Sequence, residues 1–335
     1  MNTIPVENLK AWLNANGMSI AGEIELTPLA GGQSNPTFKM TADGQEWVLR
    51  KKPPGALLAS AHAVDREFRV MKALANTDVP VPDMIALCMD ESVIGSAFYI
   101  MSFAKGRVFM DPTLPGLSNT ERELIYAELR RVAAAIHSLR PSDVGLADFG
   151  RPEGYLKRQI ERWSKQYRAS ETEHIASMEQ LMHWLPAHLP ERESTGLVHG
   201  DFRIDNVIFH PTEPRAIAVI DWELSTLGDP LVDFAYHCMS WYLTSSEFRG
   251  IKDFDLAALG IPDVETHVQG WSDLTGIDKP QDWNYYIVFN IFRMAAILQG
   301  ILARSRQGNA SASDAESTGR RARSIADAGC RLAYR

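Results

Sequence analysis

Short apolar runs alternate with polar residues along the first hundred positions, and glycine-containing turns separate several of these runs. Asp43-Gly44 stands between two of them, and Gly31-Gly32 precedes another. Runs of strand length with period-two alternation, joined by short turns, predict an antiparallel meander. The expected strands are residues 24–26, 37–40, 46–50, 84–89 and 97–103.

Elsewhere the apolar residues recur at intervals of three and four, which is the spacing of an amphipathic helix. Residues 62–75 form such a pattern between two expected strands, and residues 6–16 form another before the first strand. Beyond residue 103 the pattern is mostly helical, with one β-rich stretch at 197–224. The expected helices there are residues 121–139, 156–167, 175–185 and 285–303.

These elements predict an α+β protein with two lobes. A chain of 335 residues is too long for one small core, which favours two packed lobes. Residues 1–103 would form a lobe with a small antiparallel sheet and one inserted helix, and residues 104–335 a larger, mainly helical lobe. A Ser- and Ala-rich segment at 308–319 is expected to be a mobile loop.

Net charge and cysteine content narrow the function classes. The formal net charge is −8, which gives no support to general nucleic-acid binding. Three widely spaced cysteines argue against a zinc site or a disulfide framework and favour a reducing cytoplasm. The start of the chain lacks the cationic and apolar pattern of a signal peptide. The oligomeric state is left open.

The apolar stretch at 285–303 is the strongest candidate for a membrane span. Asn290, Arg293 and Gln299 interrupt it, whereas a span needs about 20 mostly apolar residues. We therefore expect a buried helix of a soluble protein and no membrane partner.

The segment from His199 to Asn206 reads HGDFRIDN and contains H-x-D-x-x-x-x-N, the spacing of a kinase catalytic loop. An apolar run follows, and directly after it comes Asp221. Phosphoryl transfer needs a carboxylate that orients the acceptor hydroxyl and takes its proton, the role expected of Asp201. It also needs hard oxygen ligands for Mg²⁺, for which Asn206 and Asp221 are the candidates. His199 is expected to brace the loop.

These residues, followed by Ile220-Asp221-Trp222-Glu223 and by GDPLVDFA at 228–235, resemble the phosphotransferase family that includes aminoglycoside and choline kinases. The resemblance extends over nearly the whole chain. It is strongest towards the kinase-like domain found beside acyl-CoA dehydrogenase domains, because residues 48–55 read VLRKKPPG. It implies a protein-kinase-like bilobal fold, which agrees with the strand and helix pattern. It also implies Mg²⁺ and a nucleotide donor, ATP or GTP.

The resemblance assigns nucleotide contacts to the first lobe. A basic residue on the third strand should contact the phosphates and pair with a glutamate on the inserted helix, and by position these are Arg50 and Glu67. Lys51 is the alternative, but strand alternation points it to the opposite face, so only one of the two can serve. A loop over the nucleotide, with backbone amides, and a hinge at the adenine complete the set. The loop is expected at Gly31, Gly32, Gln33 and Ser34, and the hinge at Met101 and Phe103.

Three further polar residues are expected to be structural. Asp229 stands before Pro230 at a helix start, and Asp233 lies in the first turns of that helix. His137 lies near the end of the helix expected at 121–139 and is expected to pack there.

The acceptor should be a small hydroxylated molecule, and local charge gives two candidates. The stretch 248–283 is acidic, which suits an aminoglycoside-like polycation. Residues 299–335 hold seven arginines against three acids, which suits an anion such as a hydroxyacyl-CoA. A non-catalytic kinase-fold nucleotide binder and a metal-dependent phosphohydrolase are the alternatives from other classes. The joint presence of Asp201, Asn206 and Asp221 favours the kinase.

Overall fold

The computed structural model describes residues 4–29, 35–53, 63–191, 193–307 and 314–335. Gly31, Gly32, Gln33 and Ser34, the expected nucleotide loop, lie outside these ranges. The chain forms two compact units. Unit 1 comprises residues 1–107, 208–211 and 217–225, and unit 2 comprises residues 108–207, 212–216 and 226–335. Unit 1 therefore extends past the lobe boundary expected at residue 103 and includes two later segments.

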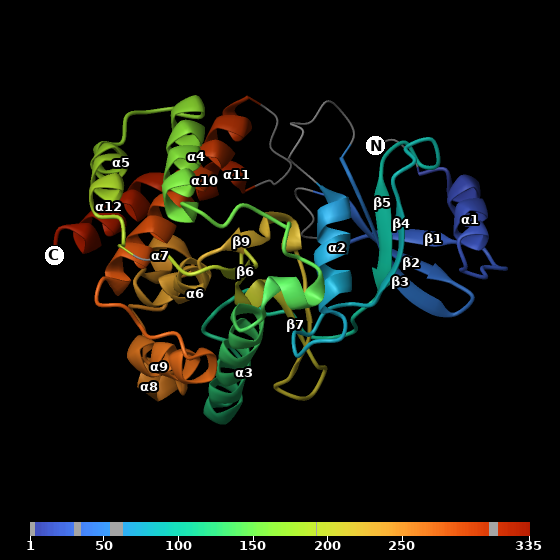
Figure 1. The fold of residues 1–335 in the computed structure, drawn as a ribbon, viewed down its shortest axis with the longest axis horizontal. Coiled ribbons are helices and arrows are strands. Elements are labelled where there is room, and N and C mark those ends of the chain that lie inside the picture. The colour runs from blue at the N-terminus through green and yellow to red at the C-terminus, as the bar shows by residue number, and fades with distance from the viewer. Residues whose placement is uncertain (1–3, 30–34, 54–62, 192, 308–313) are drawn as a thin grey trace. The chain divides into compact units, whose positions relative to one another are not determined.

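Unit 1 is built on a five-stranded antiparallel sheet in the order β1-β2-β3-β5-β4 (Figure 1). Its strands are β1 (Glu25–Pro28), β2 (Thr37–Ala42), β3 (Gln45–Lys51), β4 (Met84–Cys88) and β5 (Phe98–Ser102). All five strands agree with the alternation of apolar and polar residues, and the meander of β1, β2 and β3 is confirmed. A register shift between Met84 and Ala86 interrupts the pairing of the edge strand β4.

Two helices cover opposite faces of this sheet (Figure 1). They are α1 (Val6–Ala15) and α2 (Val64–Leu74). Alternation along β5 explains the arrangement, because successive side chains of a strand point to opposite faces. Phe98 meets Trp12 of α1 with ring centroids 5.2 Å apart, and Tyr99 meets Phe68 of α2 at 6.3 Å. The α2 face of the sheet is the one that carries the candidate phosphate-binding residue.

Unit 2 is mainly helical (Figure 1). Its longer helices are α3 (Asn119–His137), α4 (Tyr155–Ala169), α5 (Ala176–Ala187), α6 (Pro230–Cys238), α9 (Val264–Thr275), α10 (Trp283–Arg306) and α12 (Ala322–Ala333). Short helices are α7 (Ser245–Phe248), α8 (Leu256–Leu259) and α11 (Ala315–Gly319), and 3₁₀ turns occupy Pro141–Val144, Ile204–Asn206 and Met239–Trp241. α3 begins at a capping box in which Ser118 and Glu121 each accept the other's backbone N–H.

The long helix α10 lies at the centre of unit 2 and contacts α4, α5, α6, α11 and α12. By length and composition it could cross a membrane, but 83% of its most apolar window is buried within the protein. The buried helix expected at 285–303 is thus confirmed. Its polar interruptions have partners inside the unit: Asn290 donates to the carbonyl of Val232 at 2.9 Å, and Gln299 to that of Ser170 at 3.1 Å.

The β-rich stretch predicted at 197–224 forms two small sheets. β6 (Gly196–Val198) pairs antiparallel with β9 (Thr226–Gly228), and β7 (Val207–Phe209) pairs with β8 (Ala216–Val219). A 3₁₀ turn at Trp222–Leu224 follows β8. β6, β7 and β8 coincide with this stretch, whereas β9 lies beyond its predicted end. The motif HGDFRIDN therefore connects β6 to β7.

One sequence expectation fails at the end of α10. The segment 308–319 was expected to be a mobile loop, but its last five residues form α11; residues 308–313 lie outside the described ranges. Gly319 of α11 packs so closely on α10 that a Cβ at this position would lie 2.7 Å from the backbone nitrogen of Leu302. Close packing on α10 has therefore outweighed the low-complexity composition of this segment.

Candidate active site

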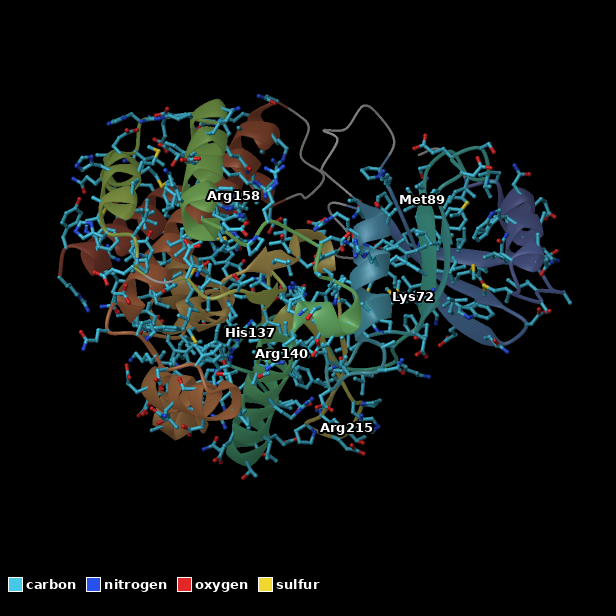
Figure 2. All side chains as sticks on the ribbon, in the orientation of Figure 1. Lys72, Met89, His137, Arg140, Arg158 and Arg215 are labelled. Atoms are coloured by element: carbon cyan, nitrogen blue, oxygen red, sulfur yellow. The ribbon has the colours of Figure 1, made fainter. Side chains whose placement is uncertain are left out.

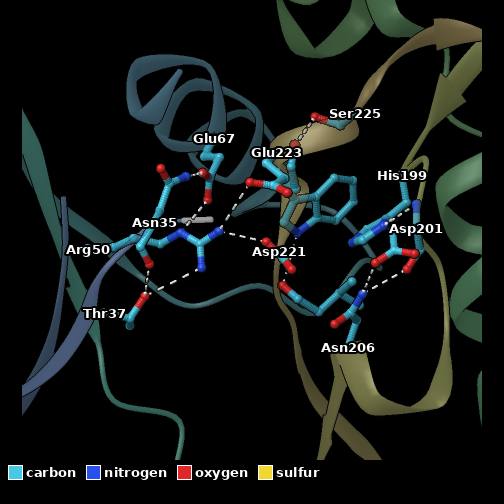
Figure 3. A network of polar contacts seen from close by, with 12 residues as sticks. Asn35, Thr37, Arg50, Glu67, His199, Asp201, Asn206, Asp221, Glu223 and Ser225 are labelled. Carbon is cyan, nitrogen blue, oxygen red and sulfur yellow. Dashed lines mark hydrogen bonds and ion pairs between the residues drawn. The ribbon is translucent and has the colours of Figure 1, made fainter. Parts of the chain in front are cut away.

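The catalytic-loop motif follows β6 in unit 2. Gly200 has φ of 83°, a left-handed conformation that glycine adopts without strain. Asp201 comes next, and its Oδ1 accepts a hydrogen bond from Oη of Tyr236 at 2.6 Å. Its Oδ2 accepts from Nδ2 of Asn206 at 3.0 Å and from Nη2 of Arg203 at 3.2 Å. Asn206 also donates to the Asp201 carbonyl at 2.8 Å, so it ties the end of the loop to its acid (Figure 3).

The electrostatic surroundings keep Asp201 ionised. Burial would raise its pKa, but the Arg203 guanidinium and the hydrogen bond from Tyr236 outweigh burial and hold the pKa below its ordinary value. Arg293 and His199 act in the same direction. His199 also accepts the backbone N–H of Asp201 through Nδ1 at 3.2 Å, the bracing contact expected from the sequence. An ionised carboxylate can accept the proton of an alcohol, which is the first requirement of a general base.

Asp233, in α6, fixes the backbone of this loop. Its carboxylate accepts the backbone N–H groups of His199 at 2.7 Å and Gly200 at 2.8 Å. His137, labelled in Figure 2, is the last residue of α3 and donates to the same carboxylate from Nε2 at 3.1 Å. Trp271 donates to Nδ1 of His137 at 3.1 Å, which fixes the tautomer with its proton on Nε2. These contacts agree with the structural roles expected of Asp233 and His137.

Asp229 is the N-cap residue of α6, as its position before Pro230 suggested. Its Oδ1 accepts the backbone N–H of Leu231 at 3.0 Å and the hydroxyl of Ser194 at 2.9 Å. Its Oδ2 is buried and has no hydrogen-bond partner among the residues that the structure describes. Burial raises the pKa of Asp229 to about 6, against the effect of these donors. The cap therefore carries an electrostatic cost at neutral pH.

In unit 1, Arg50 and Glu67 form a buried ion pair (Figure 3). Nε of Arg50 lies 2.9 Å from Oε2 of Glu67, at an angle that does not make a hydrogen bond. Glu67 is fully buried and also accepts from Nδ2 of Asn35 at 2.7 Å and from Oη of Tyr99 at 3.0 Å. Within the described ranges, Lys51 has no carboxylate within 4.0 Å. The structure therefore brings Arg50, and not Lys51, to the helix glutamate.

Asp221 joins the same cluster from the segment after β8. Nη2 of Arg50 donates to its Oδ1 at 2.6 Å, and Glu223 lies 3.9 Å from the same nitrogen. Asp221 has φ of 66°, which is strained for a residue with a Cβ, and such strain concentrates at functional sites. Burial disfavours the charge on Arg50, but Glu67 and Asp221 raise its pKa above the ordinary value. Burial also raises the pKa of Glu67, an effect that Arg50 opposes.

The expected adenine hinge falls at the end of β5. Met101 is buried in that strand, opposite Val48 of β3 and Met84 of β4. Phe103 follows the strand, and Nζ of Lys39 lies 4.9 Å from the centre of its ring. Contact of Met101 and Phe103 with a nucleotide stays a prediction.

A pocket of about 510 Å³, its open mouth included, lies beside the catalytic loop within unit 2. Arg203 and Tyr236, which both bond the Asp201 carboxylate, form part of its wall. Much of the remaining wall is apolar and comes from Met110, Tyr126, Met239 and Phe248. A ligand in this pocket would therefore meet an apolar surface together with the groups that hold Asp201.

Sequence reasoning missed Arg203, Tyr236 and Arg293. Arg293 of α10 is 4% exposed, and it donates to the carbonyl of Gly200. Arg203 lies at a variable position of the loop motif, and Tyr236 carries no motif of its own. A signal for Arg293 did exist: a charged residue inside a buried helix must have a partner there. Its role as an interruption of the apolar run was noticed, and its role beneath the loop was not.

Several residues of the two charge runs that suggested acceptors have partners within the protein. Three arginines of the basic tail pair with acids: Arg320 with Glu316, Arg323 with Glu173, and Arg331 with Glu247. Several carboxylates of the acidic stretch accept hydrogen bonds from local backbone N–H groups; these are Asp253, Asp255 and Asp263. Neither run by itself defines an acceptor site.

Comparison with known proteins settles the family. Residues 25–265 match the sequence model described as the phosphotransferase enzyme family. The chain belongs to this family. A candidate aminoglycoside phosphotransferase from Ralstonia eutropha is 50% identical, with 99% of each chain covered and a TM-score of 0.90. The structure of aminoglycoside phosphotransferase APH(4)-Ia with AMP-PNP and hygromycin B is 19% identical, covers 96% of this chain and 99% of its own, and has a TM-score of 0.61. The predicted kinase-like fold of this phosphotransferase family is confirmed.

Curated relatives confirm the nearer resemblance. Mouse acyl-CoA dehydrogenase family member 10 is 48% identical over 327 residues, which are 97% of this chain and 31% of that protein. Human acyl-CoA dehydrogenase family member 11 is 40% identical over 335 residues, 98% of this chain and 43% of that protein. The phosphotransferase chain thus spans less than half the length of these relatives.

Proposed function

We propose that this phosphotransferase is a kinase that moves the γ-phosphoryl group of ATP or GTP to a hydroxyl group of a small molecule. The observation that carries the proposal is the position of the Asp201 carboxylate, which three donors hold beside a pocket. A carboxylate has about four lone-pair sites. Tyr236, Asn206 and Arg203 use three of them, which leaves one for the hydroxyl of an acceptor.

The residues proposed to hold Mg²⁺ have suitable donor atoms. Mg²⁺ prefers oxygen ligands and is commonly bound by one or two protein groups together with phosphates. Asn206 directs its amide nitrogen to Asp201, which leaves the amide oxygen as its free ligand atom. Asp221 supplies a carboxylate and lies in a cluster with one guanidinium and two further carboxylates, so added positive charge would be favourable there. When bound, the ion would neutralise charge on the phosphates.

Each protein group then has a defined task in the proposed reaction. Arg50, fixed by Glu67, binds phosphate oxygens. Asp201 accepts the proton of the acceptor hydroxyl while the oxygen of that hydroxyl forms a bond to the γ-phosphorus. The bond between that phosphorus and the oxygen bridging to the β-phosphate breaks, and the electron pair leaves with the nucleoside diphosphate. The proton is on Asp201 at the end of the step, and positioning rather than covalent catalysis supplies the rate.

For the acceptor we propose a hydroxyacyl-CoA. The names of the curated relatives support an acyl-CoA context, although the chain spans only part of those proteins. The apolar wall of the pocket suits an acyl chain. Arg203 and Arg249 also line the pocket, but both pair with Asp205 of the same wall, so the apolar wall and not the local charge carries this choice. The paired arginines of the C-terminal tail no longer contribute to this argument.

The test measures nucleotide consumption and phosphorylated product with Mg²⁺ and with acceptors in matched pairs. Each hydroxyacyl-CoA is compared with the acyl-CoA that lacks the hydroxyl and with the free hydroxy acid. An aminoglycoside, choline and a hexose complete the panel, and Asp201→Asn is the control. We expect stimulation by hydroxyacyl-CoA alone, with a loss of about a thousandfold in the variant.

The other outcomes separate the alternatives. Hydrolysis that no alcohol changes would indicate a phosphohydrolase. Tight binding of Mg-nucleotide without any turnover would indicate a non-catalytic binder. Stimulation by an aminoglycoside but not by a CoA ester would keep the kinase and reject the acyl acceptor, and an absence of nucleotide binding would reject the kinase.

A further inference from the structure

Tyr236 contacts the Asp201 carboxylate with its hydroxyl and a buried guanidinium with its ring. Its Oη donates to Oδ1 of Asp201 at 2.6 Å, while the guanidinium of Arg293 lies 4.9 Å from its ring centre. The side chain is 2% exposed and lines the pocket beside the loop. Tyr236 lies three residues after Asp233 in α6, so both residues face the catalytic loop from the same side of the helix.

Arg293 connects this phenol to the backbone of the loop. It donates to the carbonyl of Gly200, the residue directly before Asp201, and its guanidinium also lies 5.4 Å from the ring centre of Trp163. One buried side chain of α10 therefore contacts the peptide that carries Asp201 and the aromatic ring that donates to it. A desolvated guanidinium over an aromatic face is a strong form of this contact.

The phenol can only donate in this place. Burial and the neighbouring Asp201 carboxylate both raise the pKa of Tyr236, so that it keeps its proton. A neutral phenol in a fixed position uses one of the two lone pairs of Oδ1 of Asp201. Asn206 and Arg203 use both lone pairs of Oδ2, so the remaining lone pair is on Oδ1, and its direction depends on all three donors.

We propose that Tyr236, supported by Arg293, is a positioning residue that orients the Asp201 carboxylate towards the acceptor pocket. This inference rests on the proposed kinase function and assigns the two residues no direct contact with the transferred phosphoryl group. It predicts that removal of the phenol hydroxyl impairs the transfer step and leaves substrate binding nearly unchanged, because the ring and the pocket wall stay in place.

Tyr236→Phe tests the proposal, with Tyr285→Phe as matched control. Tyr285 is also 2% exposed and also donates from its hydroxyl, but to the carbonyl of Leu185 in α5 at 3.1 Å instead of to Asp201. We expect kcat for transfer to fall about ten- to a hundredfold in Tyr236→Phe, with KM for both substrates changed less than about threefold. A larger share of consumed nucleotide should end as free phosphate. Tyr285→Phe should keep the wild-type ratio of transfer to hydrolysis.

A second pair of variants tests the support. Arg293→Lys keeps a cation near the ring but loses the planar fork, and Arg293→Met loses both. We expect kcat to decrease from the wild type to Arg293→Lys and again to Arg293→Met. The melting temperature of each variant is measured as well, so that a loss of folded protein can be separated from a misoriented Asp201 carboxylate. Equal kcat for wild type and Tyr236→Phe would overturn the inference.

The inference and the proposed function can fail separately. If the wild type transfers phosphoryl groups to no acceptor, the proposed function fails, and crystal structures of the wild type and Tyr236→Phe decide the inference alone. We expect the Asp201 carboxylate of the variant to rotate away from its wild-type orientation. An unchanged carboxylate in the variant would refute the positioning role.

Discussion

Arg50 and Asp221 are joined by a hydrogen bond of 2.6 Å between a guanidinium nitrogen and a carboxylate oxygen. The residue proposed to bind phosphate is therefore also a neighbour of the residue proposed to bind the metal. Because the same guanidinium lies 2.9 Å from the buried Glu67, its place depends on two acids from different elements. This double contact makes the position sensitive to the shape of the cation as well as to its charge.

Substitution of Arg50 tests that sensitivity. Arg50→Lys should lose most of the rate, about ten- to a hundredfold, because a point charge on a flexible stem cannot reproduce two contacts of a planar fork. Arg50→Met removes the positive charge as well and should raise the Kd for Mg-nucleotide above that of Arg50→Lys. Steady-state kinetics and calorimetric titration measure both. Lys51→Met is the matched control, and a greater loss in that variant would show that Lys51 is the phosphate ligand.

Removal of the Asp221 carboxylate should abolish the metal dependence of nucleotide binding. We expect the affinity of Asp221→Ala for nucleotide to be about a hundredfold weaker with Mg²⁺ and to be insensitive to EDTA. Glu46→Ala removes another unit 1 carboxylate, which pairs with Lys39 on an exposed surface, and it should bind normally. Unchanged affinity in Asp221→Ala would remove this residue from the proposed metal site.

Asp233 should matter for stability more than an average acid. Asp233→Asn replaces a carboxylate that accepts from His199, Gly200 and His137 by an amide that can accept with one atom only. We expect a loss of about 2–4 kcal/mol in the free energy of unfolding, measured in urea, because buried donors are left without acceptors. Asp273→Asn, on the exposed face of α9, should change it by less than about 0.5 kcal/mol.

Asp229 should make the protein less stable as the pH rises. Its pKa in the folded protein is about 6, above the ordinary value of 3.8, so the folded state binds the proton more tightly than the unfolded state does. This contribution is therefore present below about pH 4 and is lost as the pH rises through 6. Asp229→Asn cannot ionise and keeps a side chain suited to an N-cap.

The difference between the two proteins isolates that effect. The free energy of unfolding of Asp229→Asn, relative to the wild type, should rise by about 2 kcal/mol between pH 4 and pH 7. Urea unfolding at both pH values measures it, and other titrating groups cancel in the difference. A difference that does not change with pH would show that Asp229 is not the group responsible.

Local patterns were sufficient for much of the fold. Strand alternation predicted that Arg50 and Lys51 point to opposite faces, and the family resemblance selected Arg50 as the partner of the helix glutamate; in the structure Leu49 joins the core on the α1 side and Arg50 lies beside Glu67 of α2. The spacing from His199 to Asn206 predicted a kinase-like catalytic loop braced by His199, and the bracing contact of His199 is confirmed. Both predictions depend on residues near each other in the chain, where geometry leaves few choices.

Long-range contacts were beyond the sequence pattern. Tyr236 and Arg293 contact Asp201 and Gly200 only because α6 and α10 pack beside the loop. The sequence around either residue contains no motif that predicts these contacts. Arg323 and Arg331 of the C-terminal tail pair with Glu173 and Glu247, which are far away in the sequence, so the pattern could not predict these ion pairs. β9, three residues long with a terminal glycine, is a strand only because β6 pairs with it.

Residues 217–225 belong to unit 1 although the chain has by then passed through much of unit 2. Val219 donates to the carbonyl of Pro80 at 2.8 Å, and Asp221 and the buried Arg50 meet within the same unit. A gene truncated after residue 107 would therefore encode a sheet whose central guanidinium has lost one of its two acids. Unit 1 therefore cannot be exchanged between proteins as one contiguous cassette, because a chimera must carry three separate stretches of sequence, residues 1–107, 208–211 and 217–225.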